Sequence, residues 1–248
     1  MRISAANTFS TTRTQIPARG RRGGDMDKLS LCFLVVIGLP GAFLQSDMQK
    51  KAFVFPIESD KSFVTLFAQV QEPLQAFTVC LRVYTALTRP YSLFSYATRT
   101  QSNEILLFKE RSGVYSVSVG GSDAYFKTPE KSYAPVHLCI SWESSSGIVE
   151  LWVDGRPMVR TSLKKGYTVG AEASIILGQE QDSFAGNFDT NQSLVGDIGE
   201  VNMWDFVLSP VEINSVYNGQ AFSANVLNWQ GLKYEAQGEV FVKTQLWT

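Results

Sequence analysis

The sequence has little of what most enzymes need. It contains one histidine, His137, and three cysteines among 248 residues, so no pair of histidines stands at zinc-binding spacing. It also has no glycine-rich phosphate loop and no nucleophile elbow. The histidine falls in an apolar run, which favours a structural role over a catalytic one. A two-carboxylate glycosidase remains an alternative, because its acids need not be close in sequence.

An excess of positive charge is also missing from most of the chain. Six of the 22 basic residues and two of the 23 acidic residues lie in residues 1–44, so the remainder carries 16 basic and 21 acidic residues, a net charge of −5. A domain with this net negative charge has no electrostatic attraction to nucleic acid or anionic lipid. We therefore expect no nucleic acid as its primary ligand.

No hydrophobic run is long enough to cross a membrane. The longest covers residues 29–44 and is interrupted by Gly38, Pro40 and Gly41, whereas a membrane helix needs about 20 apolar residues. This run follows Met26-Asp27-Lys28 and has the form of a secretory signal. We interpret residues 1–25 as an upstream extension, 26–44 as a signal peptide and 45–248 as one secreted domain. A basic transit-type leader at the N-terminus is the alternative.

The role of each of the three cysteines follows from this division of the chain. Cys32 lies in the signal, which leaves Cys80 and Cys139 as an even pair in a secreted chain. A disulfide is the default for such a pair, and two buried free thiols are the alternative. Closing a loop of about 60 residues contributes roughly 3–4 kcal/mol to stability, mostly by restricting the unfolded chain.

Short segments with a period of two dominate the sequence after residue 45, and turn residues bound them. They cover residues 63–67, 77–84, 91–96, 104–108, 114–119, 136–142, 147–153 and 173–177. The Asp154-Gly155 pair between two such segments is a strong hairpin signal. Many strands with no alternating helices predict an all-β fold, a two-sheet antiparallel sandwich or jelly roll. No linker divides it, so we expect one domain.

One segment departs from this rhythm. Ser209-Pro210-Val211-Glu212 forms a capping box with proline at the first helical position, and apolar residues then recur at helical spacing up to Gly219. The sequence therefore predicts a single helix of about ten residues on a β body.

The stretch with the clearest chemistry covers residues 179–192. It carries the carboxylates of Glu180, Asp182 and Asp189 and the amide of Gln192, with no lysine or arginine. Gln181 could add its backbone carbonyl. Calcium takes six to eight hard oxygens of these kinds. The spacing is not that of an EF-hand, so one loop would not complete the coordination shell, and a solvated acidic loop is the alternative.

Residues 137–144 read His-Leu-Cys-Ile-Ser-Trp-Glu-Ser and match the pentraxin signature His-x-Cys-x-Ser/Thr-Trp-x-Ser/Thr at every fixed position. Further stretches resemble short pentraxins at residues 50–56, 94–98, 166–172, 176–184 and 202–210. The resemblance covers essentially all of residues 45–248. It implies a flattened jelly roll with a Cys80–Cys139 disulfide, assembled as a cyclic pentamer. Two calcium ions per subunit would lie on one face and the helix on the other. The function implied is secreted pattern recognition in innate immunity, without enzymatic activity.

Carried over by position, the family's calcium ligands fall on Asn103, Glu180, Gln181, Asp182, Asp189 and Gln192. Two positions depart from the usual pattern. Ser102 stands where phosphocholine-binding members usually carry aspartate, so the ion shared with Asn103 should bind more weakly. Asp189 stands where glutamate is common, which keeps the charge but shortens its reach.

The resemblance also implies a phosphocholine site, with Phe108 as an apolar wall, Ser118 as a small floor and Asp123 as the acid for the quaternary nitrogen. The amyloid P branch tends to carry tyrosines at the first two positions, so Phe108 and Ser118 favour phosphocholine. An ordinary strand core residue is the alternative for Phe108. An amyloid-P-like carbohydrate or pyruvate-acetal binder, or a laminin-G-like adhesive module, is the alternative function.

On the helix face, family positions that engage complement C1q fall on Asp154, Tyr217 and Glu130. Arg156 and Glu200 differ from the residues usual there. A hairpin aspartate and a helix core tyrosine are the alternatives. Finally, Asn191 begins the only N-glycosylation sequon after residue 44, inside the proposed calcium loop.

Overall fold

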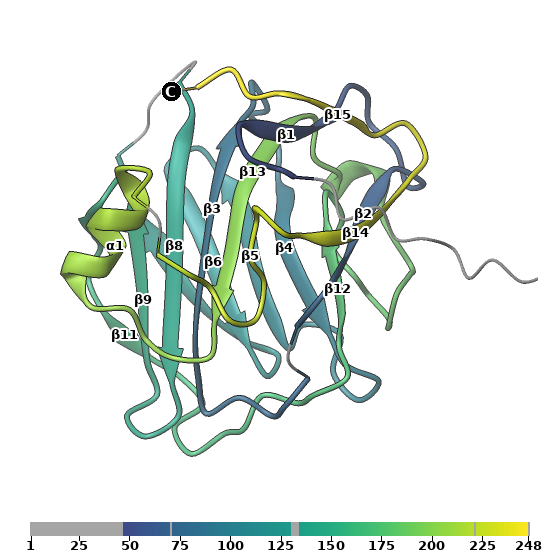
Figure 1. Cartoon of the computed structure of the whole chain (residues 1–248). Coiled ribbons are helices and arrows are strands. Elements are labelled where there is room, and N and C mark those ends of the chain that lie inside the picture. Colours follow the sequence, from purple (N-terminus) through teal and green to yellow (C-terminus); the bar gives the residue numbers. More distant parts are fainter. Residues whose placement is uncertain (1–46, 70, 130–133, 221, 248) are drawn as a thin grey trace, which may run out of the picture. The chain divides into compact units, whose positions relative to one another are not determined.

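The computed structural model describes residues 47–247 apart from 70, 130–133 and 221. The proposed extension and signal peptide lie outside these residues. The chain separates into two units, and residues Phe43–Thr248 form the larger. Fifteen strands and one α-helix make up the part that the structure describes (Figure 1). No helix among these residues has both the length and the apolar character to cross a bilayer.

The strands form two antiparallel sheets. The first has the order β10-β9-β8-β3-β13-β1-β15, and β11 also pairs with β9. Its strands are Arg156–Pro157, Ile148–Val153, Val136–Glu143, Ala76–Tyr84, Gly196–Trp204, Lys51–Phe55 and Phe241–Thr244 in that order, with β11 at Thr161–Ser162. The second has the order β14-β2-β12-β4-β5-β6-β7. Its strands are Lys233–Gln237, Phe63–Phe67, Ser174–Leu177, Tyr91–Ala97, Ile105–Arg111, Val114–Val119 and Ser122–Lys127.

The inner faces of the two sheets share one hydrophobic core, which confirms the predicted sandwich. Side chains along β5 show how it is built. Ile105 and Leu107 are fully buried in the core, whereas Leu106 and Phe108 do not belong to it. Successive side chains of a strand point to opposite faces. Leu106 and Phe108 therefore lie on the outer face of the second sheet.

The predicted segments correspond to eight of the fifteen strands that the structure describes, and β1, β7, β10, β11, β13, β14 and β15 were not among them. The case of β13, which lies between β3 and β1, shows why. This strand carries Gly196, Asp197, Gly199 and Glu200, residue types that are depleted in strands. Its register with β3 shifts between Gly199 and Asn202, and Glu200 has a φ of +55°. A bulge therefore breaks the alternation that sequence analysis relies on. The predicted hairpin is confirmed, because Asp154 and Gly155 both have positive φ.

The helix, α1, covers Pro210–Tyr217 and begins with the predicted capping box. The Glu212 carboxylate accepts from the Ser209 backbone N–H at 2.7 Å. It is eight residues long, slightly shorter than expected. Its buried residue, Ile213, packs on the outer face of the first sheet with Trp152 and Trp204. Figure 1 shows α1 beside β8 and β9. The helix and the outer residues of β5 therefore lie on opposite sides of the sandwich.

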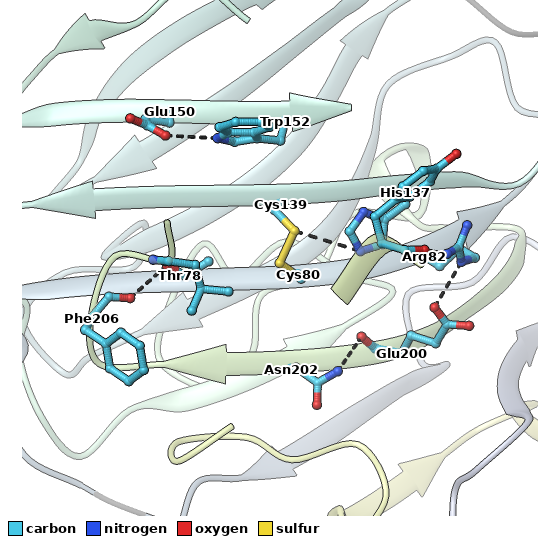
Figure 2. Close-up of a disulfide and its surroundings, with 12 residues drawn as sticks. Thr78, Cys80, Arg82, His137, Cys139, Glu150, Trp152, Glu200, Asn202 and Phe206 are labelled. Carbon is cyan, nitrogen blue, oxygen red and sulfur yellow. Dashed lines mark hydrogen bonds and ion pairs between the residues drawn. A yellow bond between two sulfur atoms is a disulfide. The ribbon is translucent and has the colours of Figure 1, made fainter. Parts of the chain in front are cut away.

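The disulfide joins Cys80 and Cys139, which stand directly opposite each other on β3 and β8 (Figure 2). His137 lies beside it, with Nε2 3.8 Å from the Cys139 sulfur. The His137 side chain is 1% exposed. Burial, followed by the positive charge of Arg82, lowers the pKa of His137 from 6.5 to about 3. A neutral, buried imidazole in this position supports a structural role.

His137 should make stability depend on pH. Between pH 6.5 and about 3 the unfolded chain binds a proton at His137 and the folded chain does not. The free energy of unfolding should therefore fall as the pH is lowered through this window, by at most about 1.4 kcal/mol per pH unit from this group. Urea unfolding between pH 7 and 4 would measure this slope. A His137→Asn variant should show a shallower slope, and equal slopes would contradict the assignment.

Candidate functional site

The outer face of the second sheet brings together the three residues proposed to bind phosphocholine. Leu106, Ser118 and Asp123 form one row across β5, β6 and β7. The Ser118 hydroxyl donates a hydrogen bond to Asp123 Oδ1 at 2.6 Å. Phe108 follows Leu106 on the same face of β5. Phe108 is therefore not part of the core between the sheets, although neighbouring groups leave it only 7% exposed.

The loop proposed to bind calcium follows β12 and is anchored to the adjacent strand, β4. The buried amide of Gln181 donates to the backbone oxygens of Ser95 and Ser174, at 3.0 Å in both cases. Ser95 pairs with Leu106, so the loop lies beside the row described above. The Gln181 side-chain oxygen accepts from the Ala185 N–H at 2.9 Å. Because the side chain is used by the fold, Gln181 has its backbone carbonyl to offer an ion.

Asn103 and Glu180 meet at this place although they are 77 residues apart in sequence. The Asn103 amide donates to Glu180 Oε1 at 3.2 Å. The other end of the same amide, Asn103 Oδ1, is buried and has no hydrogen-bond partner. A buried acceptor without a partner is costly. This oxygen is therefore suited to a cation.

Asp189 and Gln192 form a second group on the short 3-10 helix Thr190–Gln192. Asp189 caps this turn, and its Oδ1 accepts from the backbone N–H of Asn191 at 2.9 Å. Gln192 Oε1 is buried without a hydrogen-bond partner, like the oxygen of Asn103. The Arg89 guanidinium donates to the backbone oxygens of Asn191 and Ser193, which fixes the turn. The Asn191 side chain itself is exposed.

The acids of this face repel one another. Burial raises the pKa of Glu180, and the negative charges of Asp182, Glu110 and Asp123 raise it further, while the hydrogen bond from Asn103 opposes them. Carboxylates crowded in this way favour a bound cation. Together with the two unpartnered amide oxygens they fit calcium, which takes hard oxygen ligands.

Sequence analysis missed Glu110. It lies on β5 two residues after Phe108, and its Oε1 accepts from the Ser116 hydroxyl at 2.6 Å. The bond to Ser116, which pairs with Phe108, puts Glu110 on the outer face, although the register of β5 with β6 shifts between Lys109 and Arg111. The predicted segment ended at Phe108, two residues before Glu110.

Asp154 and Tyr217 line the same cavity of about 190 Å³, to which both sheets contribute, with Val83 from the first and Tyr115 from the second. Asp154 Oδ1 also accepts from the His137 backbone N–H at 3.0 Å. Glu130, the third position of this set, lies outside the described residues. Glu200 forms an ion pair with Arg82 at 3.0 Å, drawn in Figure 2.

Comparison with known proteins agrees with the family resemblance of the sequence. The Pentaxin family model matches residues 51–244. The chain is 68% identical over 224 residues to C-reactive protein of Homo sapiens and 67% identical over 222 residues to that of Sus scrofa. Both matches cover 90% of this chain and all of the relative. Mucosal pentraxin of Rattus norvegicus is 52% identical over 223 residues, with the same coverage.

Among solved structures, the heptameric SAP-like pentraxin of Limulus polyphemus has a TM-score of 0.73 at 22% identity. The match covers 81% of this chain and 97% of the Limulus chain. At this identity the likeness concerns the fold alone. The family model and the close relatives together place this chain, a pattern-recognition protein, in the pentraxin family.

Proposed function

We propose that this protein recognises phosphocholine-bearing surfaces in a calcium-dependent manner. Pentraxins bind calcium, and the observation that carries the proposal here is the pair of buried amide oxygens without partners, on Asn103 and Gln192. Asn103 lies beside Glu180, which feels the charge of Asp182, and Gln192 ends the short turn that Asp189 caps. We assign two ions to each subunit, held by these five residues and the backbone carbonyl of Gln181.

The rest of the site suits the two ends of phosphocholine. Bound calcium would supply positive charge for the phosphate. Phe108 and Leu106 provide apolar surface for the methyl groups, and Asp123 provides the acid for the quaternary nitrogen. Ser118 is 1% exposed and bonded to Asp123, so it fixes the direction of that carboxylate. The apolar side chains would thus contact the methyl groups, while the carboxylate that Ser118 orients would face the quaternary nitrogen.

We propose secretion after removal of residues 1–44 and assembly into a homopentamer. Five sites on one face would give avidity that a single pocket cannot reach. The helix side of the sandwich, with Asp154 and Tyr217, would then remain accessible to complement C1q, and we assign Glu130 to the same contact. A glycan at Asn191 is compatible with the exposure of that side chain. It would stand one residue from Gln192 and crowd the ligand.

Asp182→Asn should abolish calcium-dependent binding to immobilised phosphocholine. Removing one carboxylate takes away charge on which the assigned ions depend. Surface plasmon resonance in calcium and in chelator measures the effect. Asp205→Asn, the same change at an exposed position just after β13, should bind normally. Binding by the Asp182 variant in chelator would contradict the metal assignment. Competition by phosphoethanolamine would separate this function from the amyloid-P-like alternative.

Ser102→Asp should tighten calcium binding. The change places a carboxylate next to Asn103, and added ligand charge raises affinity. Isothermal calorimetry of the two proteins compares their dissociation constants directly. Unchanged or weaker binding would mean that position 102 faces away from the ion.

A further inference from the structure

The outer face of the second sheet carries an aromatic ring that the site described above does not use. Tyr125 lies in register with Ser116, which in turn pairs with Phe108, so the two rings belong to one row across β5, β6 and β7. The Tyr125 side chain is 63% exposed. Its hydroxyl lies 3.4 Å from Asp123 Oδ2. This ring is therefore open to a ligand that reaches Asp123.

Two carboxylates flank this ring, and each is oriented by a buried serine. Ser118 donates to Asp123 and Ser116 donates to Glu110, both at 2.6 Å. Each of these bonds uses one carboxylate oxygen. The second oxygen of Asp123 accepts a longer hydrogen bond from the Tyr125 hydroxyl, at 3.4 Å, and because a carboxylate oxygen has two lone pairs each acid can still face a cation. The charges of Asp123 and, more weakly, Glu110 both raise the pKa of Tyr125. Both acids therefore act on the space around the Tyr125 ring.

We propose that Glu110 and Tyr125 determine specificity at the cation end of the phosphocholine site. They would complete an enclosure of two aromatic rings and two carboxylates, with Phe108 and Asp123 as the other members. This inference rests on the proposed function and defines which cations it selects. The aromatic surfaces favour a quaternary ammonium, because its methyl groups are weakly hydrated and pack against rings. The carboxylates attract any cation.

The two roles can be separated because they predict different responses. Loss of the Tyr125 ring should reduce the preference for a quaternary over a primary ammonium. Loss of the Glu110 charge should weaken both kinds of cation equally. It should leave a phosphate ester without a cation unaffected. An exposed ion pair or an exposed cation–ring contact corresponds to about a two- to fivefold change in affinity.

The experiment is competition against immobilised phosphocholine at saturating calcium, with phosphocholine, phosphoethanolamine and glycerol phosphate as competitors. In Tyr125→Leu, the preference for phosphocholine over phosphoethanolamine should fall about two- to fivefold. Tyr125→Phe keeps the ring and should retain that preference. In Glu110→Gln, both cationic competitors should weaken about two- to fivefold relative to glycerol phosphate.

Glu235→Gln is the matched control for the loss of charge, because Glu235 is exposed on β14, the opposite edge strand of the same sheet. It should change none of the ratios. Calcium affinity and far-ultraviolet circular dichroism of each variant establish that the fold and the metal sites persist. If the unmodified protein binds phosphocholine with calcium and both variants keep its ratios, the inference is overturned while the proposed function stands. If the unmodified protein does not bind, both are overturned.

Discussion

Burial of the inner faces of the two sheets against each other is the constraint on which the binding face depends. Every second side chain of β5, β6 and β7 enters the core, where fully burying a large apolar side chain contributes about 1.5–3 kcal/mol. The register of these strands is fixed because a slip by one residue would exchange the two faces. The outer residues are thereby fixed as well. Phe108, Ser118 and Asp123 stand together because Leu107, Val117 and Ala124 are held inside.

This dependence explains how much of the site could be predicted from the sequence. Alternation along each strand is local, so the sequence directly predicted eight of the fifteen described strands, the hairpin at Asp154 and the capped helix. The acidic composition of residues 179–192 was visible for the same reason. Strand β13 was not, because its bulge and its Gly and acidic residues remove the alternating pattern. The family signature around His137 implied a jelly roll as a whole, without locating this strand.

Contacts between distant segments needed the structure. The meeting of Asn103 with Glu180 follows from the sheet order β12-β4-β5, which no local pattern encodes. The hydrogen bonds that tie Gln181 to Ser95 are equally non-local, and they bring the acidic loop against the strands of the ligand pocket. Sequence chemistry therefore identified which oxygens suit calcium, while topology decided which of them are neighbours.

The disulfide has a consequence for the integrity of the binding face. Cys80 and Cys139 enclose a covalent loop that contains β4, β5, β6 and β7, the strands that carry the proposed pocket. A protease that cut the chain once within this loop would produce two fragments still joined through sulfur. The eight residue pairs between β3 and β8 would hold them in register. Such a nicked protein would migrate as an intact chain until it was reduced, so damage to the recognition strands would pass unseen under oxidising conditions.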